Sequence, residues 1–307
     1  MRNIALTGAT GFVGSAALRL LLAKGHQVRA LASPGKSLPP HRLLETVPGR
    51  LNDPSALEHL VANCQAVIHI AGAISGFNYN DFAEANVRGC QNLVAAIHKQ
   101  SPQARLIHVS SLAAREPQLS PYAASKRDGE RIVNESGLDW LIIRPPAVYG
   151  PEDAALRPLW QLLARGWLPR TGSVAARFSL LHVDDLASAL AALVDTDMFE
   201  SSVFCLDDGR PGGYDWNELA RLASIARGKS VRTIGVPGWM LSAIASFNQL
   251  GARLSGRRAP VLTPGKLPEL AHIDWVCDNT QLPGCPDWKP SMQLKDSLTT
   301  LPGWSHY

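Results

Sequence analysis

The sequence predicts an α/β fold, a doubly wound parallel sheet with a smaller C-terminal substrate-binding lobe. The chain opens with an apolar strand at residues 4–6, a glycine-rich turn and then a helix. Further short apolar segments alternate with helical ones, as in open parallel sheets. Seven of the eight tryptophans lie in the second half of the chain, where large rigid side chains suit a lid over a pocket. We therefore assign residues 1–150 and 176–206 to the sheet domain, and residues 151–175 and 207–307 to the lobe.

The composition is that of a globular protein with a large core: 307 residues, 46% hydrophobic and 18% charged. We read the net charge of +4 as small and evenly spread, which argues against nucleic acid as a partner. We find no apolar stretch as long as a membrane span, and a first strand at residue 3 leaves no room for a signal peptide. We therefore expect a cytoplasmic protein. The five cysteines lack ligand-like spacing, so we expect free thiols and no metal site.

The turn after the first strand predicts a nucleotide-binding site. Gly8 permits a tight turn, Gly11 has no side chain to hold a pyrophosphate away from the backbone, and Gly14 allows close helix packing. The helix N-terminus then offers N–H groups and the positive end of its dipole to phosphate. The residues expected to contact the cofactor here are Gly8, Thr10, Gly11, Phe12, Val13 and Gly14.

The end of the second expected strand, Gln27–Ala32, bears on the choice between NAD and NADP. A carboxylate at this place would hold the ribose 2′-hydroxyl of NAD and repel the 2′-phosphate of NADP. No Asp or Glu occurs from residue 31 to residue 44. The basic side chains nearby are Arg29, Lys36, His41 and Arg42. We expect Ser33 and Lys36 to contact the cofactor and NADP to be preferred; NAD, or a merely solvated basic loop, is the alternative.

Two signals further along the chain predict a catalytic site. An apolar strand at 105–109 ends in Ser110 and Ser111, and the helix that follows carries Tyr122 and Lys126. The Tyr-x-x-x-Lys spacing places both side chains on one helix face, a turn apart. Together with the G-x-x-G-x-x-G spacing upstream, these residues resemble the active site of the extended short-chain dehydrogenase/reductase superfamily.

Two more segments carry the same resemblance. Residues 86–93 match the N-V-x-G-x-x-N-L pattern, and residues 144–151 match R-P-x-x-V-Y-G-P. The resemblance implies an NAD(P)-binding Rossmann domain of the epimerase/dehydratase family, with a tail similar to steroid-dehydrogenase-like and dihydroflavonol-reductase-like members. It implies that Asn86 supports the active-site strands. The further cofactor contacts that it implies are Ala71 and Gly72 at the ribose, and Pro145 and Val148 at the nicotinamide.

The resemblance also implies a role for each catalytic side chain. Hydride transfer to a ketone leaves an alkoxide, which Tyr122 would protonate. Ser111, with Ser110 as the fallback, would hold the substrate oxygen. Lys126 would hold the nicotinamide ribose and, with the nicotinamide cation, lower the pKa of Tyr122 from the ordinary value of about 10.

Three polar positions have structural interpretations instead. His69 lies within the apolar run 66–71, which favours a core histidine over a catalytic one. Asp53 precedes a proline and is expected to cap a helix. His182 is expected to end a strand, with an aspartate capping the following helix at 186–194 rather than a metal or a base at the histidine.

The leading function is an NADP-dependent oxidoreductase acting on a mainly apolar ketone or secondary alcohol. An NAD-dependent nucleotide-sugar epimerase or dehydratase is the alternative, and would need an arginine near Arg177 for the diphosphate. A non-catalytic NAD(P)-binding regulator or accessory subunit ranks lower, because such relatives tend to lose the Tyr–Lys pair. The apolar helix expected at 239–254 could pack, line the pocket or rest on a membrane, and packing is favoured. A homodimer is possible.

Overall fold

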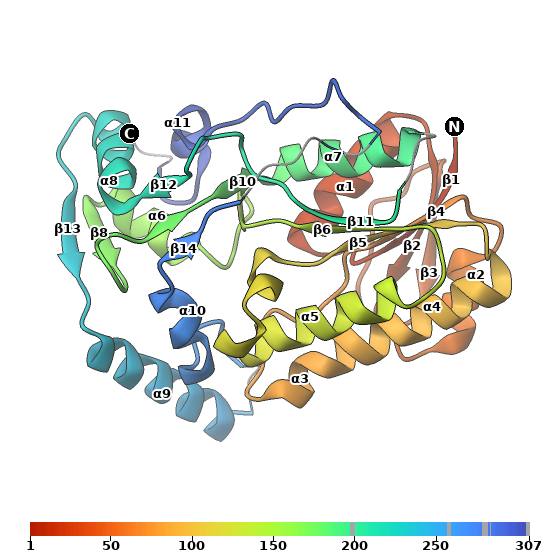
Figure 1. Ribbon diagram of the computed structural model, residues 1–307, viewed down its shortest axis with the longest axis horizontal. Helices are drawn as coiled ribbons and strands as arrows, with labels where there is room; N and C mark the ends of the chain where they lie inside the picture. The colour runs from red at the N-terminus through yellow and green to blue at the C-terminus, as the bar shows by residue number, and fades with distance from the viewer. Residues whose placement is uncertain (197–199, 257–258, 278–281, 283, 305–307) are drawn as a thin grey trace.

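The fold is organised around a seven-stranded parallel sheet with the strand order β11-β6-β5-β4-β1-β2-β3 (Figure 1). The computed structural model describes residues 1–196, 200–256, 259–277, 282 and 284–304. The strands of the sheet are β1 (Asn3–Thr7), β2 (Gln27–Ala32), β3 (Leu44–Pro48), β4 (Ala66–His69), β5 (Arg105–Val109), β6 (Trp140–Arg144) and β11 (Ser202–Cys205). The order reverses between β1 and β4, so the predicted doubly wound sheet is confirmed.

Helices cover both faces of the sheet. One face carries α1 (Phe12–Ala23) and α7 (Val183–Asp195); the other carries α2 (Pro54–Val61), α4 (Gly89–Gln100) and α5 (Pro121–Asn134) (Figure 1). A short helix α3 (Tyr79–Ala83) and a π-helical turn at Glu84–Arg88 lead into α4. Successive strand residues point to opposite faces. Ile4 and Leu6 therefore enter the core under α1 and α7, and Ala5 enters the core under α2 and α4. Because both faces are covered, the inner strands β1, β4 and β6 are mostly apolar, whereas the edge strand β3 is largely exposed.

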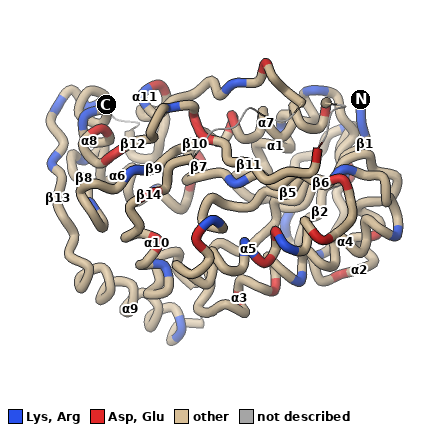
Figure 2. Tube along the Cα trace, viewed as in Figure 1, with Lys and Arg blue, Asp and Glu red and all other residues tan. Residues whose placement is uncertain are grey.

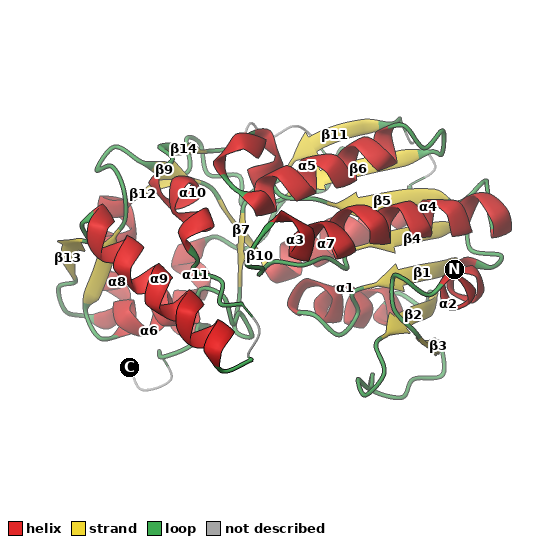
Figure 3. Ribbon diagram, turned by 90° about the horizontal axis from the view of Figure 1, so that it is seen from below, coloured by secondary structure: helices red, strands yellow, loops and turns green. Residues whose placement is uncertain are grey.

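A second body lies beyond the carboxyl ends of the strands (Figure 3). Its strands are β7 (Ala147–Tyr149), β8 (Trp167–Arg170), β9 (Arg177–Phe178), β10 (Leu180–His182), β12 (Tyr214–Asp215), β13 (Arg232–Gly235) and β14 (Asp274–Trp275). Its helices are α6 (Arg157–Ala164), α8 (Trp216–Arg227), α9 (Gly238–Leu254), α10 (Leu267–Ala271) and α11 (Leu294–Ser297). It has a core of its own around Tyr149, Trp160 and Trp304. Leu282 and Trp288 instead pack back against α1 and α7, so the division at residue 207 stays an interpretation.

The helix caps confirm one expectation and correct another. Asp53 caps α2, accepting a hydrogen bond from the Ala56 N–H at 3.1 Å. The helix expected at 186–194 begins at Val183, and its N-cap is His182, so the prediction of an aspartate cap is wrong. Asp185 lies inside the first turn, where its buried carboxylate accepts hydrogen bonds from the segment around Ser291.

Candidate active site

The glycine turn is packed so closely that Gly8 and Gly14 leave no room for a side chain. Gly8 has a φ of +81°, and a Cβ there would lie 2.7 Å from the Ala71 backbone nitrogen. A Cβ at Gly14 would lie 2.0 Å from the Gly8 carbonyl oxygen. Gly11 is the N-cap of α1 and provides no side chain to cap it. The first turn of the helix therefore leaves its N–H groups available to an anion, as a dinucleotide phosphate requires.

Asn86 ties the loop after β4 to α5. Its side chain accepts a hydrogen bond from the Ala73 N–H at 2.8 Å and donates one to the Ser125 hydroxyl at 2.9 Å. A Cβ at Gly72 would lie 2.7 Å from Asn86 Oδ1 and 3.9 Å from Lys126 Nζ. The expected ribose segment and Lys126 thus lie side by side, and Asn86 has the supporting place that we expected for it.

The predicted Ser, Tyr and Lys side chains converge beside the loop at Gly72 and the glycine turn. Helix α5 starts at its N-cap Ser120, which brings Tyr122 within hydrogen-bonding reach of the Ser111 hydroxyl. Lys126 lies one turn further and donates to the Val109 carbonyl oxygen at 2.9 Å. Ser110, the fallback, is buried and donates to Glu130 at 2.5 Å. The geometry therefore favours Ser111 over Ser110 as the partner of the phenol.

Burial dominates the protonation of this site. It raises the pKa of Tyr122 to about 12; the hydrogen bond from Ser111 opposes the shift, and the negative charge of Glu269 adds to it. Burial also lowers the pKa of Lys126 to about 8, against the opposing effects of Cys90 and Glu130. The net shift is upward because desolvation of the phenolate outweighs the other effects. The lowering that we expected from Lys126 and the nicotinamide cation concerns the complex with oxidised cofactor and stays a prediction.

Two charged residues at this site were missed by the sequence analysis. Lys266 Nζ lies 4.1 Å from the centroid of the Tyr122 ring and 2.6 Å from Glu269 Oε2. Glu269 also accepts a hydrogen bond from Ser120. They come from the 3-10 turn Pro264–Lys266 and from α10, and they cover the phenol from the lobe side. The i, i+3 spacing of Lys266 and Glu269 indicates an ion pair, but it does not reveal the distant tyrosine.

Ser33 and Lys36, which we expect to select the cofactor, lie at the same edge of the sheet as the glycine turn. Ser33 and Lys36 form an exposed turn just after β2, closed by a hydrogen bond from the Lys36 N–H to the Ser33 carbonyl at 2.9 Å. The Arg29 side chain lies away from this turn. Its guanidinium binds Glu45 at 3.0 Å and the His59 carbonyl at 3.1 Å, so it is not one of the cations at this edge.

The segment expected at the nicotinamide follows β6. The Pro145 carbonyl accepts a hydrogen bond from the Leu112 N–H at 2.8 Å, which joins it to the segment carrying Ser111. Val148 packs against the core under α1 and α7. A Cβ at Gly150 would lie 3.3 Å from the Phe12 ring, so this segment also lies next to the start of α1.

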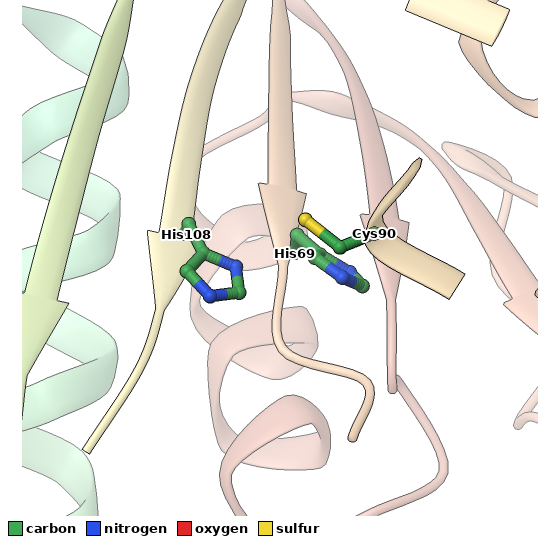
Figure 4. A group of neighbouring side chains, drawn as sticks. All are labelled: His69, Cys90 and His108. Atoms are coloured by element: carbon green, nitrogen blue, oxygen red, sulfur yellow. The ribbon is translucent and has the colours of Figure 1, made fainter. Parts of the chain in front are cut away.

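A group of buried side chains lies under the active site (Figure 4). His69 and His108 are register partners on β4 and β5, and their potential ligand atoms and that of Cys90 all lie within 4.8 Å of one another. Burial lowers the pKa of His69 to about 3 and lowers that of His108 as well, with the Lys126 ammonium adding to both shifts. His69 also hydrogen-bonds Thr7 Oγ1 at 2.7 Å, so the expectation of a core histidine is confirmed. The positive charge of Lys126, which lowers the pKa of both histidines, disfavours a metal cation there.

Arg177, the arginine that we considered for binding a nucleotide-sugar diphosphate, forms its contacts with other residues of the lobe. Arg177 Nε donates to the Gly212 carbonyl at 2.6 Å, and another guanidinium nitrogen lies 3.6 Å from Asp215.

A surface hollow lined by Ile4, Arg42 and Cys64 lies at the amino ends of β1–β3. It is at the opposite edge of the sheet from Tyr122 and is not part of this site.

Comparison with known proteins agrees with this geometry. The family model of the NAD dependent epimerase/dehydratase family matches residues 4–202. A ceramide reductase from Caulobacter vibrioides (strain NA1000 / CB15N) is 38% identical over 275 residues, covering 89% of this chain and 85% of that protein. A 2-alkyl-3-oxoalkanoate reductase from Stenotrophomonas maltophilia (strain K279a) is 32% identical over 212 residues, 61% of this chain and 63% of that protein.

A solved structure has the same fold. MoeE5 in complex with UDP-glucose and NAD superposes with a TM-score of 0.74 at 21% identity, covering 99% of this chain and 98% of that one. The chain belongs to the NAD dependent epimerase/dehydratase family and is an NAD(P)-dependent enzyme of the extended short-chain dehydrogenase/reductase superfamily.

Proposed function

We propose that this protein is an NADP-dependent reductase of a long-chain, mainly apolar ketone, working through Ser111, Tyr122 and Lys126. The observation that carries the proposal is the convergence of Ser111, Tyr122 and Lys126 beside the loop at Gly72 and the glycine turn. A dinucleotide phosphate fits this place because the α1 N-cap, Gly11, has no side chain to occupy the N–H groups of the first turn.

Each side chain has a distinct task in the proposal. When bound, the nicotinamide supplies the hydride. The residues that would hold the cofactor are Gly8, Thr10, Gly11, Phe12, Val13, Gly14, Ser33, Lys36, Ala71, Gly72, Tyr122, Lys126, Pro145 and Val148. Ser111 donates a hydrogen bond to the substrate oxygen, and Tyr122 delivers the proton to that oxygen. A phenol with a raised pKa keeps its proton at neutral pH, which suits the reducing direction.

Two observations support an apolar substrate. Two relatives that are more than 30% identical are named as a ceramide reductase and a 2-alkyl-3-oxoalkanoate reductase, and both named compounds carry alkyl groups. Arg177, the residue that would suit a diphosphate, is already bound to the turn at 212–215. The epimerase alternative would have to break these contacts of Arg177, or use Arg165 or Arg170 instead.

The test is loss of NADPH absorbance with N-acyl-3-ketosphinganine and a 2-alkyl-3-oxoalkanoate as candidate substrates. We expect turnover of at least one of them with NADPH, and slower turnover with NADH. No turnover of either ketone, together with conversion of a UDP-sugar, would contradict the proposal.

A further inference from the structure

Helix α9 carries an apolar stripe that the protein itself leaves uncovered. Trp239, Phe247, Leu250 and Leu254 are spaced three, four and eight residues apart and so lie on one side of the helix. Their exposed fractions are 75%, 75%, 54% and 81%. Ala245 is the one buried residue of the helix. Packing, which we favoured for this segment, does not account for it.

The segment that contains α9 carries an excess of positive charge, although Arg221 and Lys266 are ion-paired with Glu218 and Glu269 just outside it. Residues 219–268 contain eight of the chain's 30 Lys and Arg and none of its 26 Asp and Glu. The rest of the chain therefore has 22 basic and 26 acidic residues, so the expectation of an evenly spread charge is wrong. Figure 2 shows no acidic segment on α9 or β13. Arg232 and Arg253 are among the exposed cations of this stretch.

The helix also lies beside the active site. Its far end contacts the loop after β4, where the Arg253 guanidinium lies 5.2 Å from the centroid of the Phe77 ring. It packs against the turn at Pro264–Lys266, whose Lys266 lies over Tyr122. In Figures 1 and 3, α9 forms an outer edge of the molecule next to α10. A surface bound by α9 would thus lie close to the covered side of the phenol.

We propose that α9 docks on an anionic phospholipid bilayer, lying in the plane of the interface with its apolar stripe inserted. Of the described residues, no helix is long and apolar enough to cross a membrane, so the stripe is suited to lying on the bilayer rather than spanning it. Basic side chains beside an inserted stripe attract anionic headgroups.

Charge decides between a bilayer and a second copy of this chain. Two copies joined through α9 would bring together two segments that each have an excess of basic residues in the sequence, and like charges across an interface oppose association. An anionic bilayer offers the opposite charge. This docking surface goes beyond the proposed reductase activity and does not depend on it.

The experiment is co-sedimentation of the full-length protein with two kinds of vesicle. One is phosphatidylcholine, and the other has equal parts of phosphatidylglycerol and phosphatidylcholine. We expect binding to the anionic vesicles that weakens as salt is raised, because salt screens the attraction between cations and headgroups. The double variant Phe247→Ser/Leu254→Ser should bind roughly tenfold more weakly or worse, since two inserted side chains are lost.

Ile225→Ser is the matched control, because Ile225 is 66% exposed but lies on α8. It should bind as the unmodified protein does. Circular dichroism and NADPH binding show that each variant is folded. The proposal is overturned if the unmodified protein does not bind anionic vesicles, or if the double variant binds them equally well. It is also overturned if the same two substitutions instead abolish a dimer measured by sedimentation equilibrium.

Discussion

Tyr122 is the side chain on which the proposed proton transfer depends. Tyr122→Phe should fold and bind NADPH but turn over a ketone roughly 10²- to 10⁴-fold more slowly, the range for losing a positioned general acid. The hydroxyl is removed while the ring that contacts Phe82 and Lys266 is kept. Steady-state kinetics and cofactor fluorescence measure the two effects separately.

Tyr79→Phe is the control for this prediction. Tyr79 also uses its hydroxyl in a hydrogen bond, to Asp128 at 2.6 Å, but on the exposed side of α5. Its removal should leave turnover unchanged. Near-normal turnover by Tyr122→Phe would remove the proton donor from the proposal.

Ser33 decides the cofactor preference in our interpretation. Ser33→Asp places a carboxylate at the end of β2, where it repels a 2′-phosphate and can accept a hydrogen bond from a ribose hydroxyl. The unmodified protein should bind NADPH more tightly than NADH, and the variant should reverse that order. Fluorescence titration of both proteins with both cofactors measures the relative affinities for NADPH and NADH. Tighter NADH binding by the unmodified protein would contradict the assignment.

The buried histidines make stability depend on pH. Because burial lowers the pKa of His69 and His108, the unfolded chain binds protons below pH 6.5 that the native protein does not. The free energy of unfolding should therefore fall with falling pH below about 6.5, by about 1.4 kcal/mol per pH unit for each histidine, and for His69 down to about pH 3.

Urea unfolding of the unmodified protein and of His108→Leu tests this dependence. The variant keeps an apolar side chain of similar size and should show a shallower loss of stability at acid pH. His98→Gln, at an exposed histidine, is the control. An equally steep loss in His108→Leu would show that other groups cause it.

At the scale of single elements, the strands were the most predictable part. The predicted ranges of β2 and β5 match the structure residue for residue, because both strands are mostly apolar and lie between segments rich in Gly, Ser and Pro. The start of α7 was missed because His182, an unusual capping residue, replaces the expected aspartate. Lys266 and Glu269 could not be placed, since their contact with Tyr122 joins segments far apart in the sequence.

Helix α1 depends on a glycine that no other residue can replace. Gly14→Ala would put a Cβ 2.0 Å from the Gly8 carbonyl, so the turn must move; we expect a loss of roughly 1–3 kcal/mol and much weaker cofactor binding. Gly251→Ala in α9 is the matched control, because no atom lies within 4 Å of its Cβ. It should lose no stability, since Ala favours helix over Gly. Denaturant unfolding and NADPH titration distinguish the two variants.

At the scale of the whole molecule, our proposal assigns the chemistry to the sheet domain and the choice of substrate to the lobe. The glycine turn and the Ser-Tyr-Lys group were predictable because each lies in a short local pattern. The structure of the lobe was not predictable, because its core joins α6, α8 and the end of the chain around Trp160 and Trp304. Apolar side chains at wide sequence separation give no local pattern, which is why the exposed face of α9 could not be foreseen.

The substrate class can be decided by a binding panel with NADPH present. We expect long-chain ketones to bind and UDP- and GDP-sugars not to, because a diphosphate brings two negative charges that need charge-assisted partners. Arg177 is held by Gly212 and Asp215, and freeing it would cost those contacts. Burying an alkyl chain instead gains roughly 25 cal/mol per Å² and needs few polar groups beyond Ser111 and Tyr122. Micromolar binding of a nucleotide sugar that is lost in Arg177→Ala, but not in the neighbouring Arg165→Ala, would instead assign the protein to the epimerases.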